Sequence, residues 1–353
     1  MNIFILPSKN KNNKYIDLLL NSLVSEGSDL VLHKLEKDTV WNVFKIVTFG
    51  KIKKTKNIVH IQWSTILYGS KYLLKSIISL LFNILLFIIL KLFFNTKVVW
   101  TIHNFHAHDY SHPTMDRFGR KCLFTISDLI IVQQKITFKD FSNKYPDKKI
   151  QYLPHGNYIG EYGSQKEIDL TMRRSLGFGD NDIVLLSLGV IAPYKRNEDI
   201  INAVTEARKN SPEIKLLIIG KGKENYVNKL KDIAGLGDGI IIKNYFVPDL
   251  EIPTYFSVSN YSIFYYDDSE MTSGGIVLSL SYGLPVISRN IPGSEIVTGN
   301  SGYVFSNFNE LISVLKRLPN KFENTSPDDI IDSVRQYEWN SIASELINKY
   351  KSI

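Results

Sequence analysis

Short apolar runs alternate with helical patterns along the whole chain, and the alternation occurs in two series. The runs of the first series cover residues 2–6, 58–62, 98–102, 129–132 and 150–153. Those of the second series cover residues 183–189, 214–222, 239–242, 261–264 and 285–288. Strand–helix alternation is typical of parallel sheets. We therefore predict an α/β protein with two Rossmann-like domains, whose parallel sheets face each other across a cleft.

A polar, glycine-containing stretch, Gly156–Gly179, separates the two series and forms the natural junction. Since domains hold about 150 residues each, a chain of 353 residues suits two of them. We assign residues 1–165 to the first domain and residues 166–330 to the second. An apolar stripe along residues 331–353 predicts a C-terminal helix.

The composition narrows the classes of partner. A formal net charge of +7 suits a nucleic acid, an anionic membrane or an anionic small substrate. No zinc-finger spacing, RNP-like aromatic motif or basic zipper is visible, which disfavours nucleic acid. The single cysteine, Cys122, excludes an intramolecular disulfide framework and favours a cytoplasmic address. The N-terminal sequence is typical of a short buried strand and not of a signal peptide.

Between Lys75 and Lys91 lie fifteen uncharged residues, SIISLLFNILLFIIL, at the centre of an expected helix at about 72–94. A spanning helix needs about twenty predominantly apolar residues. Three interpretations remain open: a buried core helix, a helix that dips into one leaflet beside lysines that contact anionic headgroups, and a true span. The strand expected directly afterwards disfavours the span. We predict a membrane-facing helix, which can also contribute one face to the core.

The polar stretch 269–288 holds the best candidate site. Thr272, Ser273, Gly274 and Gly275 open a short helix, whose free backbone N–H groups could cradle phosphate. The plainer alternative is an ordinary helix cap with a tight turn. No G-x-G-x-x-G follows the first strand and no G-x-x-x-x-G-K-[ST] occurs, so the fingerprints of NAD dehydrogenases and P-loop NTPases are missing.

Several motifs in this half resemble a known family. Glu270, the Gly283–Val286 turn, Pro292-Gly293 and Glu295–Val297 are similar to the donor-site signature of GT-B glycosyltransferases, especially the GT4-like group. The Thr-Ser-Gly variant resembles a bacterial surface-polysaccharide branch. Leu278 stands where that family typically has a glutamate that holds the nucleotide ribose.

Weaker matches extend over most of the chain, in the order that the family has them. They are IVHIQW at 58–63, WTIHN at 100–104 followed by His108-Asp109, LPHG at 153–156, and GVIAPYK at 189–195. The family's arginine position holds Val190, and Arg196 replaces its final glycine.

The resemblance implies roles for individual residues. Gly189, Lys195 and Arg196 would bind the donor, and Glu270 would bind the hydroxyl groups of its sugar. Thr272, Ser273, Gly274 and Gly275, at the start of the helix, would also bind the donor. His103 would touch the donor sugar. If the enzyme inverts, Asp109 is the first candidate for the general base and His103 the second. Asn104 and His108 would lie on the acceptor side.

We expect neither a metal nor another cofactor. His103, His106, His108, His112 and Asp109 could in principle bind zinc, but their spacing matches no helix-borne pattern. In the resembling fold, the last helix crosses back to the first domain, which binds the acceptor. The alternative is a helix that packs only on its own domain.

The resemblance implies a glycosyltransferase that takes a UDP- or GDP-sugar. The acceptor would be a polyprenyl-diphosphate-linked saccharide in polysaccharide or O-antigen biosynthesis, at the inner face of the plasma membrane. Two alternatives remain: a GT-B-fold nucleotide-sugar epimerase, and a catalytically degenerate, membrane-docked partner subunit.

Overall fold

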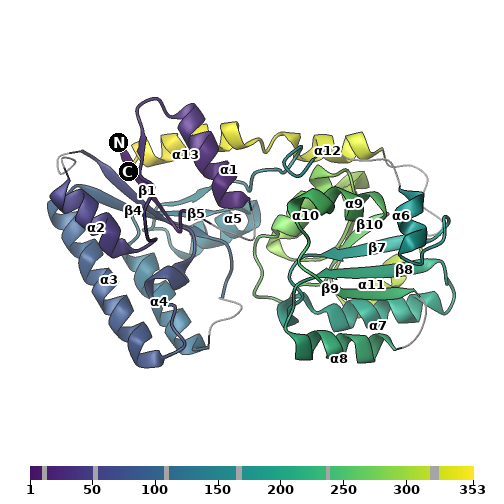
Figure 1. The fold of residues 1–353 in the computed structure, drawn as a ribbon. Helices are drawn as coiled ribbons and strands as arrows, with labels where there is room; N and C mark the ends of the chain where they lie inside the picture. The colour runs from purple at the N-terminus through teal and green to yellow at the C-terminus, as the bar shows by residue number, and fades with distance from the viewer. Residues whose placement is uncertain (10–13, 51–54, 107–110, 164–168, 236–238, 319–325) are drawn as a thin grey trace. The chain divides into compact units, whose positions relative to one another are not determined.

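The computed structural model describes residues 1–9, 14–50, 55–106, 111–163, 169–235, 239–318 and 326–353. Two units divide the chain (Figure 1). Unit 1 comprises Met1–Gly156 together with Tyr337–Ile353, and unit 2 comprises Asn157–Gln336. The boundary that we placed after residue 165 therefore lies at Gly156.

Unit 1 is built on a parallel sheet with the described strand order β2-β1-β3-β4-β5-β6. Its strands are β1 (Asn2–Leu6), β2 (Val31–Leu32), β3 (Asn57–Ile61), β4 (Thr96–Ile102), β5 (Leu129–Val132) and β6 (Ile150–Tyr152). Its helices are α1 (Tyr15–Glu26), α2 (Val40–Phe49), α3 (Leu73–Phe93), α4 (Pro113–Ile126), α5 (Lys135–Lys144) and α13 (Trp339–Lys351).

Unit 2 repeats the plan with the described order β12-β11-β10-β7-β8-β9. Its strands are β7 (Ile183–Leu188), β8 (Ile214–Gly220), β9 (Ile240–Asn244), β10 (Tyr261–Phe264), β11 (Val286–Arg289) and β12 (Gly302–Phe305). Its helices are α6 (Leu170–Ser175), α7 (Asn197–Arg208), α8 (Glu224–Ala234), α9 (Ile252–Ser257), α10 (Gly274–Ser281), α11 (Phe308–Leu315) and α12 (Pro327–Arg335). Two parallel sheets confirm the predicted α/β class.

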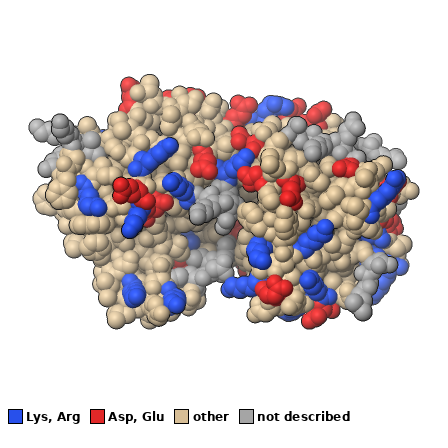
Figure 2. Space-filling model, in the orientation of Figure 1, with Lys and Arg blue, Asp and Glu red and all other residues tan. Residues whose placement is uncertain are grey.

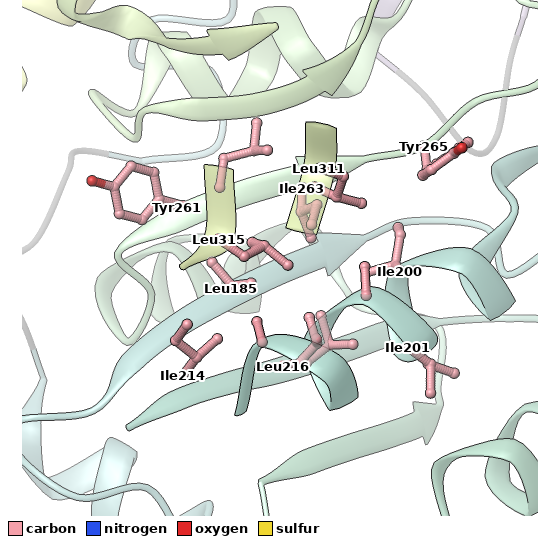
Figure 3. Packing of buried hydrophobic residues seen from close by; sticks show 14 of the residues in the cluster. Leu185, Ile200, Ile201, Ile214, Leu216, Tyr261, Ile263, Tyr265, Leu311 and Leu315 are labelled. Atoms are coloured by element: carbon pink, nitrogen blue, oxygen red, sulfur yellow. The ribbon is translucent and has the colours of Figure 1, made fainter. Parts of the chain in front are cut away.

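The central strands of unit 2 are mostly apolar because both faces of the sheet are covered. Along β7, Ile183 and Leu185 point into one hydrophobic cluster, whereas Val184 and Leu186 point into another. Figure 3 shows the first cluster, in which Leu185 and Ile263 of the sheet meet Ile200 of α7 and Leu311 of α11. Successive side chains of a strand alternate between its faces, so a continuous apolar run serves both layers.

The C-terminal segment forms two helices where we expected one. A break at residues 336–338 separates α12, in unit 2, from α13, in unit 1. Six buried residues of α13 join the core of unit 1, which also takes in α1 (Figure 1). Gly156 lies directly against the Trp339 ring, where an added Cβ would collide. The last helix therefore completes the fold of the first unit.

Candidate functional site

The candidate donor site gathers at the carboxyl ends of β7 and β10 in unit 2. Gly189 follows β7 with φ at +111°, a backbone conformation that glycine adopts without strain. A Cβ at Gly189 would lie 3.1 Å from Lys195 Nζ, and a Cβ at Gly220 would collide with the Gly189 carbonyl. Glycine at both positions thus leaves room for the lysine to fold back over the strand end.

Lys195 ends the short 3-10 helix Pro193–Lys195 and is half-buried. Its Nζ donates to the Leu188 carbonyl oxygen at 3.3 Å. Burial lowers the pKa of Lys195 to about 8, and the negative charge of Glu270 opposes that fall. Because this pKa lies only slightly above neutral pH, an additional anion beside the side chain would further favour its protonated form.

Glu270 is the buried carboxylate of the loop after β10, and 7% of it is exposed. Arg289 of β11 braces this loop, because its Nη1 donates to the Tyr266 carbonyl at 2.9 Å and its Nη2 lies 2.7 Å from Asp268 Oδ1. Burial raises the pKa of Tyr266 well above its usual value, and the Glu270 charge adds to the rise. The loop thus holds Glu270 in place beside neutral polar groups.

The start of α10 has the geometry of an anion cradle. Ser273 caps the helix by accepting from the Ile276 N–H at 3.2 Å, and its Oγ lies 2.7 Å from the Tyr266 hydroxyl. The N–H groups of Gly274 and Gly275 belong to the first turn, which has no intrahelical acceptors. A Cβ at Gly293 would come within 2.8 Å of the Met271 carbonyl and 3.0 Å of the Ser273 nitrogen. Glycine at that position allows the two loops to pack closely.

Arg196 and Leu278 both contact other residues of unit 2. Arg196 adopts the left-handed conformation, with its Nε 2.7 Å from Asp199 Oδ2 and its guanidinium over the Tyr265 ring at 4.8 Å. Of the two adjacent basic residues, Lys195 is the one that interacts with Glu270. Leu278 packs against the apolar cluster around Tyr282 and Leu284, so α10 presents an apolar side chain there.

In unit 1, His103 follows β4 at the corresponding sheet edge. The Trp63 ring stacks on its imidazole, with ring centroids 5.1 Å apart, and Tyr15 approaches edge-on at 5.2 Å. Burial lowers the pKa of His103 to about 3, and His155 lowers it further. Asn104 accepts from Arg120 Nη1 through its carbonyl oxygen, at 2.7 Å. The expected base Asp109 and acceptor-side His108 lie outside the described residues.

The motifs did not single out several polar residues around His103. Gln62 Oε1 lies 2.9 Å from His103 Nε2, and Gln133 donates to the Tyr15 hydroxyl at 3.1 Å. Each glutamine directly follows a strand, which was the only signal in the sequence. Within the described part of the chain, no group of three His, Cys, Asp or Glu side chains could hold a metal ion.

Solved structures with the same architecture define the class of fold. HepE from Anabaena, crystallised with UDP and glucose, is 14% identical, and the alignment covers 100% of both chains with a TM-score of 0.70. Sucrose-phosphate synthase from Thermosynechococcus elongatus is 13% identical, with a TM-score of 0.71 over 100% of this chain and 98% of the other. The chain has the GT-B fold of glycosyltransferases.

Residues 182–320 match the family described as Glycosyl transferases group 1. A GDP-mannose-dependent α-(1-6)-phosphatidylinositol monomannoside mannosyltransferase of Mycolicibacterium smegmatis is 23% identical over 58% of this chain and 53% of its own length. An α-monoglucosyldiacylglycerol synthase of Streptococcus pneumoniae is 26% identical over 54% of this chain and 46% of its own. The chain thus spans about half the length of these curated relatives. The resemblance seen in the motifs is confirmed: residues 182–320 are similar to group 1 glycosyltransferases, and the chain has the GT-B fold.

Proposed function

We propose that the protein is a glycosyltransferase that uses a nucleotide-sugar donor, with the donor held by unit 2. The observation that carries this proposal is the placement of Lys195, Glu270 and the first turn of α10 at one edge of one sheet. Sugar transfer leaves a nucleoside diphosphate, on which negative charge develops. A cation and preorganised N–H groups stabilise such a charge, and a carboxylate can accept hydrogen bonds from sugar hydroxyls.

We propose that the donor is a UDP-sugar or a GDP-sugar. HepE was crystallised with UDP, and the mycobacterial relative is named for GDP-mannose. We extend to this chain the chemistry that these names share, a nucleoside diphosphate linked to a hexose. Lys195 and the N–H groups of the first turn of α10 can balance the charge of a diphosphate, so we propose a metal-independent reaction.

We further propose that the acceptor is carried by a membrane lipid, because α3 has two apolar faces. One face is buried and holds Ser76, Leu80, Asn83, Phe87 and Leu90. The other face is exposed at the same helical spacing and holds Leu74, Ile78, Leu81, Leu85, Ile88 and Leu92. Leu81 is 59% exposed and Leu92 71%. By length and composition alone α3 is the described helix that could cross a membrane, but one third of its most apolar window is buried.

Packing within unit 1 favours a helix that lies on the membrane surface. Asn83 Nδ2 and Ser79 Oγ both donate to the Leu67 carbonyl, each at 2.9 Å. Lys91 is drawn inward by Asp128, 3.0 Å away, whereas Lys71 and Lys75 are exposed at the start of the helix. Figure 2 shows a mostly uncharged surface over α3 with basic side chains at its lower end. An apolar stripe beside lysines suits an anionic lipid surface.

The names of both curated relatives include a lipid, which supports a lipid acceptor here. Within that class we propose a polyprenyl-diphosphate-linked saccharide, in polysaccharide or O-antigen biosynthesis, at the inner face of the plasma membrane. The motif resemblance to surface-polysaccharide enzymes supports this narrower choice.

The first experiment measures thermal stabilisation of the full chain by UDP, GDP, CMP and dTDP. A ligand that binds only the folded protein at about 100 times its Kd stabilises it by about 2.7 kcal/mol. We expect UDP or GDP to raise the melting temperature. Absence of a shift with every nucleotide would instead favour a catalytically degenerate partner subunit.

The second experiment tests Glu270→Gln, which keeps the size of the side chain and removes its charge. Transfer from the preferred donor should fall at least about 100-fold, since one well-placed transition-state contact contributes on the order of 3 kcal/mol. Glu206→Gln, at a half-buried position on α7 of the same unit, serves as the matched control. Full activity of a folded Glu270→Gln protein would refute the donor site. Interconversion of free nucleotide sugars without transfer would identify an epimerase.

A further inference from the structure

Gln62 is buried next to His103, at the carboxyl edge of the unit 1 sheet. β3 and β4 are neighbouring parallel strands with Ile61 opposite Trp100, so the residues that follow them meet at one edge. The Gln62 backbone N–H donates to the Leu6 carbonyl at 2.8 Å, and only 1% of the residue is exposed. The side chain is therefore held in place independently of any substrate.

The two ends of the Gln62 amide face two histidines. Its Oε1 lies 2.9 Å from His103 Nε2, and its Nε2 lies 3.3 Å from His60 Nε2. His60 is in turn fixed by the Tyr350 hydroxyl, 2.6 Å from Nδ1, and by Thr101 Oγ1, 2.7 Å from Nε2. A buried polar network thus runs from α13 through β3 to the end of β4.

The chemistry of the amide determines the position of the proton on His103. An amide oxygen only accepts hydrogen bonds, so the imidazole nitrogen beside it must carry the hydrogen. A neutral His103 protonated on Nε2 has its lone pair on Nδ1. The Gln133 side chain also interacts with the ring and raises the pKa of His103, and its Oε1 atom is buried without a hydrogen bond of good geometry. A lone pair on Nδ1 and a buried amide oxygen that lacks a well-formed hydrogen bond suit a ligand that brings hydroxyl groups, such as a sugar.

We propose that Gln62 is a positioning residue, which keeps the proton of His103 on Nε2 and leaves Nδ1 as the acceptor for a sugar hydroxyl. The proposal rests on the proposed function only for the identity of that hydroxyl. The tautomer itself is a property of the free protein and can be measured without a substrate.

Charged and titratable groups around His103 keep it neutral at ordinary pH. His155 and Arg120 both lower its pKa, and burial lowers it most, while the Gln133 side chain raises it. His60 and Tyr15 also face the ring, and the pKa of His60 is itself lowered to about 3 by burial and by His103. We therefore expect no titration of His103 between about pH 5 and pH 8.

The test is long-range proton–nitrogen NMR of the histidine-labelled full chain, with His103→Asn identifying the His103 signals. The wild-type protein should show a protonated Nε2 and an unprotonated Nδ1. Gln62→Glu should raise the pKa of His103, because a carboxylate beside Nε2–H stabilises the imidazolium. Gln62→Met, of similar size but without an acceptor, should shift population toward the Nδ1–H tautomer. Gln151→Glu, on β6 of the same sheet, is the matched control and should leave the signals unchanged.

Activity gives an independent readout. Gln62→Glu should add an acidic limb to the pH profile of kcat, since protonated Nδ1 cannot accept a hydrogen bond, and Gln62→Met should lower kcat about 10-fold at unchanged KM for the donor. A wild-type proton on Nδ1, or a tautomer and pKa unaffected by both substitutions, would overturn the proposal. If the NMR results hold while no nucleotide binds, Gln62 still sets the tautomer and only the proposed function fails.

Discussion

Lys195 is placed so that its charge depends on what lies beside it. Burial brings its pKa to about 8, and Glu270 supplies the opposing negative charge. A bound diphosphate would add further negative charge and would raise this pKa. An occupied site therefore extends the protonated state of the lysine to higher pH than an empty one.

This arrangement predicts a pH dependence of nucleotide binding. Below about pH 8 Lys195 is protonated and attracts the diphosphate, and above it the attraction is lost as the proton leaves. Affinity for UDP or GDP, measured by calorimetry, should fall between about pH 7 and about pH 9. Lys195→Arg should remove the dependence because arginine keeps its proton throughout this range. An equal decline in wild type and Lys195→Arg would show that another group controls it.

The sequence was informative about the donor site because its residues lie in short local motifs. Glu270, Ser273 and Gly274 fall within five residues, and the helix start could be predicted from them. The environment of His103 could not be predicted in this way. Gln62 is 41 residues away in sequence, and the contact between Gln133 and Tyr15 joins residues 118 apart. Only the register of the strands brings such residues together.

At the scale of elements, the apolar runs predicted most of the described strands, the three-residue β6 among them, and missed β2 and β12. β2 has two residues, and β12 begins with Gly302, so neither shows the pattern of a buried strand. The apolar content of α3 alone did not show which of its faces is buried, although the small polar residues Ser76 and Asn83 both lie on the buried one. Packing of one face against unit 1 separates the two faces, and the exposed stripe becomes visible only in the structure.

We expect Leu81→Asp combined with Leu85→Asp to abolish binding to vesicles that contain anionic lipid, with little effect on folding. Each leucine is more than half exposed, and charge at a lipid-facing position opposes insertion. Flotation of the full chain on phosphatidylglycerol vesicles measures the effect. Val24→Asp, at an exposed apolar position on α1, is the control. Flotation by the double variant at the wild-type level would exclude the α3 stripe as the contact surface.

At the scale of the whole molecule, unit 1 is assembled from both ends of the chain. α13 contributes six buried side chains, and Lys56 Nζ donates to the carbonyl oxygen of Tyr350 at 2.8 Å. Burial of six such residues is worth on the order of 10 kcal/mol, which is comparable with the whole stability of a domain. The polar link from Tyr350 to His60 passes through the same contact.

Truncation after Gln336 should therefore unfold unit 1 and leave unit 2 folded. Hydrogen exchange followed by mass spectrometry should show rapid exchange in the peptides of β1, β3 and β4, with continued protection of β7 and β8. Nucleotide-induced protection in unit 2 should also survive, because the residues proposed to hold the diphosphate, Lys195 and the first turn of α10, lie there. Protection of β3 in the truncated chain would contradict this expectation.

The place of α13 also has a consequence for biosynthesis. During translation, residues 1–156 are made before unit 2, but α13, which completes their fold, is made after it. Unit 2 can fold before unit 1 has received α13, which reverses the usual N-to-C order of domain folding. Every message that is cut short before codon 337 would then yield a chain with an exposed apolar groove along α1. Such a chain is a ready substrate for proteases, so only completed copies of the protein would accumulate.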